Sequence, residues 1–428
     1  MKVWDLEKEF DAFLSFVVGG REKKRQNIRS VVEEVRRGIL TRGEKALIEF
    51  SVKWDGWQKT FGLKLSEEEI KTEAARVSKK DSSVLRGMIR NVRAFHRQQG
   101  GRKRIYKRDG LVVREEFVPF ERALVYVPGG TAPYPSSLVM GVVPAQLAGV
   151  REVIVTTPAK NGTINPYILA AAVLLDIKDV YRIGGAQAIY AFSYGIGSIP
   201  RVDMIVGPGN TYVEEAKRDV YGRVGIDMLA GPTELIVLCT ESFSPKAVAW
   251  DLFSQTEHDE MATVGLFSKS REHLYDTLRA IEKHMASNTR RDIIEKALKQ
   301  NSYFVFYRDV GNAVKAINLI APEHLELIGD EKVEKEILYP GVIYLGPHTP
   351  VAMGDYYIGT NHVLPTGGAG RFTAGLSVDR FTKRKAVVKI DKGFLNRYGD
   401  KAIRLSEIEG LFAHGESIKV RKELSNET

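Results

Sequence analysis

Apolar residues recur along this chain with two different periods, and the change of period predicts how the chain is organised. Before about residue 100 the spacing is helical. The clearest example is the series Val84, Leu85, Met88, Ile89, Val92 and Phe95. Arginines lie between these apolar positions. The spacing therefore predicts a helical N-terminal region with a packing helix over about residues 84–95.

From about residue 123, short β-branched runs alternate with helical stretches. The first series of expected strands is 123–127, 152–156, 180–183 and 204–206. The second series is 235–238, 263–267, 303–306 and 342–345. Strands that alternate with helices are typical of βαβ units around a parallel sheet, so two series predict two α/β domains.

Composition narrows the class of protein. The 428 residues, 43% of them hydrophobic, are enough for about two or three domains and exclude a largely disordered chain. No apolar run approaches the roughly 20 residues that cross a bilayer, and the first residues mix acids with bases. The single cysteine, Cys239, forbids an intrachain disulfide. We therefore expect a cytoplasmic protein with no membrane partner.

The net charge of +9 reflects 63 Lys and Arg against 54 Asp and Glu. Basic runs occur at residues 21–29, 102–108 and 383–385. Acids interleave the surrounding segments, and no aromatic stacking motif, zinc-finger spacing or basic zipper accompanies the runs. We interpret them as solvated surface and expect no nucleic-acid partner.

Three glycine-containing segments directly follow expected strands of the first series, at residues 128–130, 184–187 and 207–210. Ligands of an open parallel sheet bind beyond the carboxyl ends of the strands, where glycine lets backbone N–H groups approach phosphate. None of the segments has the GxGxxG fingerprint, so the sequence does not support a standard dinucleotide mode. Each alone fits a tight turn, but three at strand ends favour a ligand cleft.

The eight histidines fall into two groups by their surroundings. Four lie in charge-rich or loop contexts and are assigned to the surface: His96, His273, His284 and His348. The other four lie among carboxylates, amides and glycines: His258, His324, His362 and His414. This second group holds the candidate chemistry.

Gln255 and His258 are three residues apart, so on a helix they share a face and can reach one ion. Adding Asp355 and His414 gives a mixed nitrogen and oxygen ligand set that suits zinc, manganese or another divalent transition metal. Each histidine alone also fits a capped helix end or a satisfied core group. Spacing alone cannot assemble the four side chains.

Pro322 predicts a helix that starts here and places Glu323 and His324 in its first turn. A helix N-terminus disfavours an imidazolium, so His324 is expected to stay neutral and to accept a proton as a general base. A glutamate in a first helical turn is also ordinary electrostatics and needs no catalytic role.

At these residues the chain resembles the histidinol dehydrogenase family. The segments that carry the resemblance are 127–130, 183–188, 206–210, 225–232, 251–259, 321–325, 354–356, 361–366 and 409–411. The resemblance implies a four-electron oxidation of L-histidinol through the aldehyde to L-histidine, the last steps of histidine biosynthesis, with two NAD reduced. It also implies one zinc ion per subunit, completed by substrate nitrogens, and an NAD site that does not use the usual Rossmann mode.

The same resemblance implies a role for individual residues. The implied zinc ligands are Gln255, His258, Asp355 and His414, and the implied acid/base pair is Glu323 and His324. The implied NAD contacts are Tyr126, Gln187 and Asn210. The implied substrate contacts are Thr233, Gln255, His258, His324, Asp355, His362, Glu409 and His414. The chain departs from the usual family pattern at Thr233 (commonly serine), Val351 (often acidic) and Gly415 (usually alanine).

Pattern and resemblance together predict an α/β fold: two Rossmann-like parallel-sheet domains, a helical N-terminal part and a small swapped C-terminal segment. Residues 1–122 with 238–376 are expected to form the first domain, 123–237 the second, and 377–428 a dimerisation segment. Family members are intertwined homodimers, so Glu409 and His414 can belong to the same subunit's site or to the partner's. The last segment is polar and too short for a core of its own, which fits a swapped element.

Other functions remain open on the sequence alone. A metal-dependent hydrolase could use the same Gln, His, Asp and His set with Glu323 as base, but it has no use for a dinucleotide cleft. A noncatalytic NAD-sensing or nucleic-acid-binding protein would need affinity without turnover. A cysteine-dependent aldehyde dehydrogenase would need a reactive Cys239, which ends an apolar strand and is expected to be buried and inert.

Overall fold

The computed structural model describes residues 2–19, 26–58, 61–129, 132–159 and 161–427. Gly130 of the first glycine segment and residues 21–25 of the first basic run lie outside the described residues. The chain forms two compact units. The larger unit consists of Met1–Gln99 with Phe120–Phe381, and the smaller unit of Gly100–Pro119 with Thr382–Thr428.

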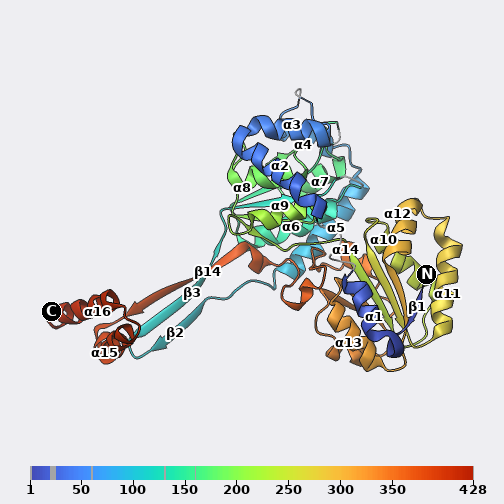
Figure 1. Ribbon diagram of the computed structural model, residues 1–428. Coiled ribbons are helices and arrows are strands. Elements are labelled where there is room, and N and C mark those ends of the chain that lie inside the picture. Colours follow the sequence, from blue (N-terminus) through green and yellow to red (C-terminus); the bar gives the residue numbers. More distant parts are fainter. Residues whose placement is uncertain (1, 20–25, 59–60, 130–131, 160, 428) are drawn as a thin grey trace. The chain divides into compact units, whose positions relative to one another are not determined.

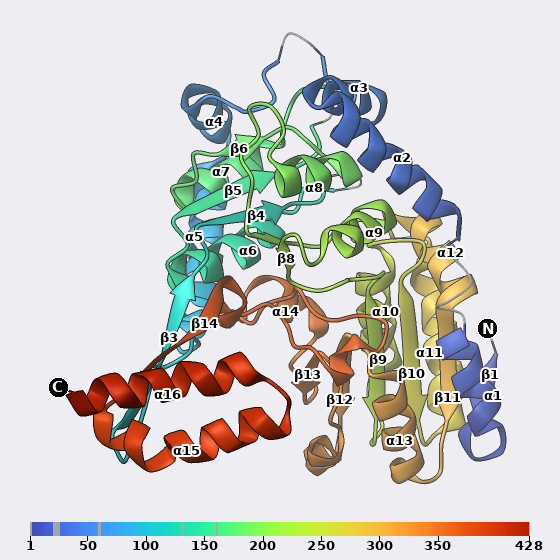
Figure 2. The same ribbon diagram turned by 60° about the vertical axis from the view of Figure 1, so that its left-hand side comes forward.

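The first sheet of the larger unit has six parallel strands in the order β1-β11-β10-β9-β12-β13. Their bounds are Val3–Asp5 (β1), Ser302–Phe306 (β11), Thr263–Ser268 (β10), Glu234–Cys239 (β9), His324–Ile328 (β12) and Val342–Leu345 (β13). One face packs on α1 (Leu6–Gly19) and α13 (Val310–Ile320). The other packs on α10 (Pro245–Thr256), α11 (Arg271–Met285) and α12 (Arg291–Asn301) (Figures 1 and 2).

The second sheet has five parallel strands in the order β6-β5-β4-β7-β8. Their bounds are Val180–Tyr181 (β6), Glu152–Thr156 (β5), Arg122–Tyr126 (β4), Met204–Val206 (β7) and Gly225–Ile226 (β8). One face packs on α4 (Glu67–Ala74), α5 (Lys79–His96), α6 (Pro135–Ala148) and α7 (Pro166–Leu174). The other packs on α2 (Gln26–Arg42), α3 (Glu44–Asp55), α8 (Gly185–Tyr194) and α9 (Thr211–Val220).

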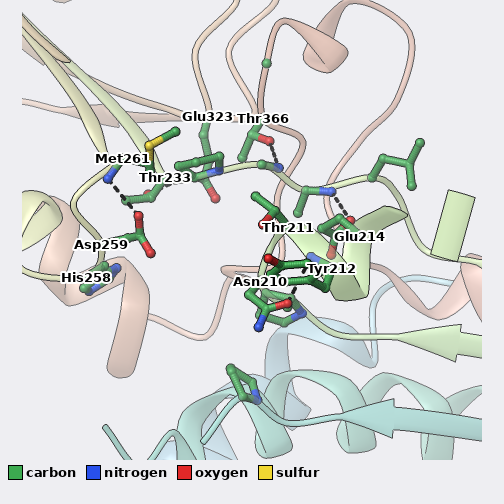
Figure 3. Close-up of a pocket in the computed structure, with 18 of the residues that line it drawn as sticks. Asn210, Thr211, Tyr212, Glu214, Thr233, His258, Asp259, Met261, Glu323 and Thr366 are labelled. Atoms are coloured by element: carbon green, nitrogen blue, oxygen red, sulfur yellow. Dashed lines mark hydrogen bonds between the residues drawn. The ribbon is translucent and has the colours of Figure 1, made fainter. Parts of the chain in front are cut away.

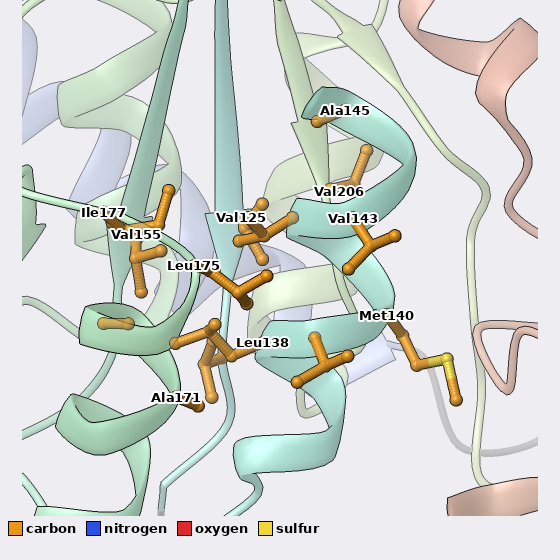
Figure 4. Close-up of a cluster of buried hydrophobic side chains, with 14 of the residues drawn as sticks. Val125, Leu138, Met140, Val143, Ala145, Val155, Ala171, Leu175, Ile177 and Val206 are labelled. Atoms are coloured by element: carbon orange, nitrogen blue, oxygen red, sulfur yellow. The ribbon is translucent and has the colours of Figure 1, made fainter. Parts of the chain in front are cut away.

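Each central strand is apolar on both faces, as expected for a parallel sheet covered by helices on each side. In β4, Leu124 enters the cluster under α8 and α9, while Val125 enters the cluster under α6. Figure 4 shows Val125 facing the α6 side chains Leu138 and Val143. A Cβ on Gly141 would lie 2.5 Å from Val125 Cγ1, so this glycine allows α6 to approach the sheet closely.

The smaller unit is a three-stranded antiparallel sheet in the order β14-β3-β2, followed by a helical hairpin. Its elements are β2 (Arg104–Arg108), β3 (Leu111–Pro119), β14 (Thr382–Ile390), α15 (Lys392–Ile408) and α16 (Phe412–Glu427). Asp109 and Gly110 both have positive φ, 48° and 91°, which suits a two-residue hairpin turn. Among the described residues, the larger unit also has helix α14 (Val351–Tyr356) and three short 3-10 helices: η1 (Glu331–Glu336), η2 (Ala369–Arg371) and η3 (Val378–Phe381).

The expected α/β class with two parallel sheets is confirmed, and all eight expected strands are present with ends shifted by a few residues at most. The domain division expected from the sequence put 1–122 in one domain. The structure instead pairs 104–119 with 382–390, and packs α2 to α5 on the second sheet. Among the described residues, no helix is both long and apolar enough to cross a membrane.

The surface assignment is wrong for two of the four histidines. His96 is 0% exposed and its Nδ1 lies 2.7 Å from the Gln99 side chain. His273 is 4% exposed and its Nδ1 lies 3.1 Å from the Ser268 hydroxyl. Both rings lie on the inner face of a helix that is otherwise charged, so the surrounding charges misled the interpretation.

Removing a core side chain of β4 should destabilise the larger unit. Leu124 is fully buried, so Leu124→Ala is expected to lower the free energy of unfolding by about 2–5 kcal/mol. Val84→Ala, at a 55% exposed position of α5, serves as the control and should change it little. Urea unfolding followed by circular dichroism measures both. Equal midpoints for the two variants would contradict the packing described here.

Candidate active site

A cavity of about 1440 Å³ in the larger unit collects most of the predicted site residues (Figure 3). The second sheet contributes segments that follow the carboxyl ends of β4, β6 and β7. The first sheet contributes residues at the amino ends of β9, β10 and β12. Ligand binding at the carboxyl edge is usual for parallel sheets, whereas the use of the amino edge is particular to this site.

Ten of the twelve predicted site residues line this one cavity: Tyr126, Gln187, Asn210, Thr233, Gln255, His258, Glu323, His324, Asp355 and His362. The remaining two lie in the smaller unit. Glu409 caps the C-terminus of α15, and His414 lies in the first turn of α16. Their functional roles stay predictions.

The helix predicted from Pro322 is wrong. Helix α13 ends at Ile320, Ala321 takes a left-handed conformation with φ 47°, and His324 is the first residue of β12. His324 pairs with Leu235 of β9 on one side and Val342 of β13 on the other. The fixed φ of Pro322 suits an extended chain as well as the start of a helix. The pairing of the following residues with β9 and β13 therefore determined that they form a strand.

Burial, rather than a helix dipole, sets the protonation of the Glu323–His324 pair. Glu323 and His324 are 7% and 2% exposed. Burial raises the pKa of Glu323 to about 8, although hydrogen bonds to its carboxylate oppose the shift. Burial lowers the pKa of His324 to about 4, against the opposing charge of Asp355. At neutral pH the imidazole is therefore neutral and the carboxyl group is largely protonated.

Hydrogen bonds hold Glu323 while leaving His324 free to act. The Thr233 hydroxyl donates to Glu323 Oε2 at 2.7 Å, and the Glu234 N–H donates to the same oxygen at 3.0 Å. His324 Nε2 lies 3.8 Å from Glu323 Oε1. Its Nδ1 is buried and finds no hydrogen-bond partner in the described part of the chain. His324 lines the cavity, and a neutral imidazole there is suited to accepting a substrate proton.

Three of the four candidate metal ligands are grouped in the cavity. Helix α10 ends at Thr256, so Gln255 lies in its last turn and His258 in the turn that follows, not on a shared helical face. Asp355 lies in α14 (Val351–Tyr356) and accepts from Gln255 Nε2 at 3.3 Å. Thr233 Oγ1 lies 2.9 Å from Gln255 Oε1.

The donor chemistry of this group fits zinc. Burial lowers the pKa of His258, while Asp355 opposes that shift, so the imidazole is available in the neutral form that binds metal. Carboxylate oxygen and imidazole nitrogen are both ordinary zinc ligands, and an amide oxygen extends the set. No cluster of three or more His, Cys, Asp or Glu side chains among the described residues could hold a metal by itself. Gln255 lies beside Asp355, and its amide oxygen would add a further donor to this group.

His362 supports the metal candidates from the side. Its Nδ1 lies 2.9 Å from the Asp355 carbonyl oxygen, so Nδ1 carries the proton and Nε2 is left as an acceptor. The Ser137 hydroxyl lies 3.4 Å from that Nε2. His362 thus contacts the backbone of Asp355, whose side chain is a candidate metal ligand.

The glycine segments form the other side of the cavity. The Tyr126 hydroxyl accepts from the Gly185 N–H at 3.1 Å. Asn210 caps α9 by accepting from the N–H groups of Tyr212 and Val213, each at 3.1 Å. Figure 3 shows Asn210 and Tyr212 on this side, opposite His258.

Sequence reasoning missed Asp55, which lines the same cavity. It is the last residue of α3, and its Oδ2 accepts from the Gly184 N–H at 3.0 Å and from Gln187 Nε2 at 3.1 Å. Burial raises the pKa of this carboxyl group. The only signal in the sequence is an acidic residue before Gly56, the left-handed helix cap, and that pattern is too common to single out.

Thr233 connects the acid/base pair to the candidate ligands, so its hydroxyl is expected to matter for metal binding. Thr233→Val removes the hydroxyl that contacts both Gln255 and Glu323 and should weaken zinc binding by about 10–100-fold. Thr233→Ser keeps the hydroxyl and should bind zinc like the unmodified protein. Competition against a chromophoric chelator measures both affinities. Equal zinc affinity in the valine and serine variants would contradict the connection.

Comparisons with known proteins identify the family. The family model for histidinol dehydrogenase matches residues 20–422. The histidinol dehydrogenase of Syntrophotalea carbinolica is 39% identical over 419 residues, which are 97% of this chain and 97% of the relative. That of Carboxydothermus hydrogenoformans is 41% identical over 412 residues, covering 95% of this chain and 96% of the relative.

A solved structure gives the same result for the fold. The crystal structure of histidinol dehydrogenase from Elizabethkingia anophelis superposes with a TM-score of 0.91 at 34% identity, covering 99% of this chain and 98% of that chain. A family model, full-length relatives and a solved structure thus agree over nearly the whole sequence. The chain belongs to the histidinol dehydrogenase family.

Proposed function

We propose that this enzyme oxidises L-histidinol through L-histidinal to L-histidine in the cytoplasm, with zinc bound at the site and two NAD reduced per turnover. Membership of the family supports the oxidation of histidinol in histidine biosynthesis. The observation that carries the detailed proposal is the buried Glu323–His324 pair, which shares one cavity with three candidate zinc ligands and three candidate NAD contacts.

In the first oxidation, His324 takes the proton of the histidinol hydroxyl as a hydride leaves the adjacent carbon. The lowered pKa of His324 keeps the imidazole neutral, so the ring has a nitrogen lone pair that can accept this proton at neutral pH. Bound NAD would receive the hydride in each of the two oxidations. The products of this step are the aldehyde, NADH and the proton held by His324.

In the second oxidation, Glu323 assists the addition of water to the aldehyde. Its raised pKa, about 8, lies near the working pH, so both forms are present: the ionised fraction of Glu323 can take a proton from water, and the protonated form can return one. Once His324 has released its first proton to solvent, it can take a hydroxyl proton of the hydrate as the second hydride leaves. The acid formed then loses its remaining proton and is the carboxylate of histidine. Because one cavity serves both steps, the reactive amino aldehyde need not be released between them.

Zinc would be held by Gln255, His258 and Asp355 from the cavity and by His414. Bound zinc would act as a template that orients the substrate for hydride transfer. On the protein side, Thr233 and His362 hold the ligands in place, since they contact Gln255 and the Asp355 backbone. For NAD, Tyr126, Gln187 and Asn210 would supply the contacts.

Two of the alternatives lose support from the structure. Cys239 is 0% exposed and burial raises the pKa of its thiol to about 12, so it does not suit a nucleophilic thiolate. A metal-dependent hydrolase would leave the Tyr126, Gln187 and Asn210 side of the cavity without a purpose. Absence of NAD-dependent turnover would favour that hydrolase.

The proposal predicts two NADH per histidinol, with activity lost on chelation and recovered with zinc. His324→Asn removes the base and should lower kcat by about 10²–10⁴-fold. His348→Asn, at an exposed position outside the cavity, is the matched control and should leave kcat unchanged. NADH absorbance measures turnover in the unmodified enzyme, before and after chelation, and in the two variants. One NADH per histidinol, or an active asparagine variant at position 324, would contradict the mechanism.

The smaller unit supports a homodimer. It leaves Leu405, Ile408 and Phe412 of its helical hairpin 61%, 66% and 77% exposed. Side chains of this size on one short hairpin are expected to be covered by another chain. In our proposal Glu409 and His414, which lie on the same hairpin, complete the site of the partner subunit.

Mixed dimers test this arrangement. Co-expression of His324→Asn and His414→Ala chains creates one site per mixed dimer with both residues intact, if His414 acts on the partner. Random pairing then predicts about a quarter of the unmodified activity, because half of the dimers are mixed and half of their sites are intact. Each variant alone is expected to be nearly inactive. No recovery above the single variants would show that His414 serves its own subunit.

A further inference from the structure

A buried charged cluster lies behind the 207–210 segment, and the mechanism does not use it. Lys217 of α9 has a fully buried side chain, and its Nζ lies 2.7 Å from Asp227 Oδ1, which is also fully buried. Glu214 Oε1 lies 3.4 Å from the same Nζ. Burial opposes a charged lysine, but Asp227 and Glu214 outweigh it and raise the pKa of Lys217. The ammonium group is therefore a permanent part of this core.

The lysine and its partner hold both polar groups of the Gly207 residue. Lys217 Nζ donates to the Gly207 carbonyl oxygen at 3.1 Å, and the Gly207 N–H donates to Asp227 Oδ2 at 2.7 Å. Gly207 has φ +112°, and a Cβ there would lie 2.1 Å from the Tyr126 carbonyl oxygen. The residue is thus fixed by charge-assisted hydrogen bonds and pressed against a residue of the proposed NAD site.

The same cluster holds the neighbouring segment that leads to Thr233. Glu214 Oε2 accepts from the Ala230 N–H at 2.8 Å, and Asp227 Oδ1 accepts from the Met228 N–H at 2.7 Å. Figure 3 shows Glu214 close to Asn210 and Tyr212 in the cavity. Burying three ionisable groups costs solvation free energy even when they are paired with one another, so a buried ion pair is weak evidence for a role in stability. These three groups also bind backbone groups of cavity segments, which suggests a functional role.

We propose that Lys217 is a positioning residue that, through Gly207, fixes the cofactor-side segment Gly207–Asn210 in the conformation that binds NAD. The inference rests on the proposed NAD-dependent function. Lys217 itself does not line the cavity, so it acts through the backbone and through Asp227 rather than on the cofactor. If Lys217 only stabilised the fold, its loss would affect the binding of NAD and the binding of histidinol alike.

The test compares Lys217→Met with the double variant Lys217→Met, Asp227→Asn. The single variant leaves two carboxylates without their cation and is expected to be less stable. Relative to the single variant, the double variant removes one of these two carboxylates and keeps an oxygen for the Gly207 N–H. Its thermal stability should recover in part, because the Met228 N–H still loses its acceptor. In both, nothing donates to the Gly207 carbonyl, so KM for NAD should rise by about tenfold or more. KM for histidinol and the zinc content should stay close to those of the unmodified enzyme.

Arg122→Met is the matched control. Arg122 is the first residue of β4 and donates to Glu152 of β5 at 2.5 Å. This pair lies at the amino ends of the strands, whereas the cavity segments follow their carboxyl ends. Its loss should lower stability without changing KM for NAD. A stable double variant with an unchanged KM for NAD overturns the inference. An unmodified enzyme that shows no NAD turnover overturns the proposed function instead.

A measurement on the unmodified protein covers the case in which neither lysine variant folds. The amide of Gly207 should exchange with solvent as slowly as the amides of β7, because a buried carboxylate accepts from it. Hydrogen exchange resolved at this residue gives the rate. Exchange as fast as an exposed loop amide would show that the segment is not held, and would overturn the inference.

Discussion

Exclusion of water from two neighbouring side chains is the constraint on which this site depends. In water at neutral pH, a glutamate side chain is ionised and a histidine side chain is largely neutral. Burial at the start of β12 shifts the pKa of Glu323 upwards and that of His324 downwards. The pair thereby gains a strictly neutral base and a carboxyl group that titrates near the working pH.

The parallel sheets supply the rigidity that such burial requires. His324 lies between β9 and β13, and Glu323 is held by Thr233 and the Glu234 N–H at the start of β9. Burying the Glu323 carboxyl group without these hydrogen-bond partners would cost free energy of folding. The register of β9 and β12 therefore determines the chemistry of the site as well as the fold. The second sheet faces the same cavity with its carboxyl ends, which brings segments far apart in sequence around one substrate volume.

The sequence predicted the two parallel sheets well, because buried β-branched runs such as Glu152–Thr156 carry a strong local signal. It also identified ten residues of the cavity, but only the family resemblance gave most of them a role. Local pattern failed at β12, where Pro322 suggested a helix and tertiary pairing imposed a strand. It failed for Asp55 and Lys217 as well, because their significance comes from contacts with Gly184 and Gly207 that no local spacing reveals.

Burial keeps the His324 imidazole neutral, and nitrogen-15 NMR of the histidine side chains can observe this protonation state. A titration of the metal-free protein, with the His324 signal assigned by its absence in His324→Asn, follows the protonation of this ring alone. We expect a neutral imidazole throughout the neutral range, with protonation only as the pH falls towards about 4. An ordinary titration near pH 6.5 would contradict it.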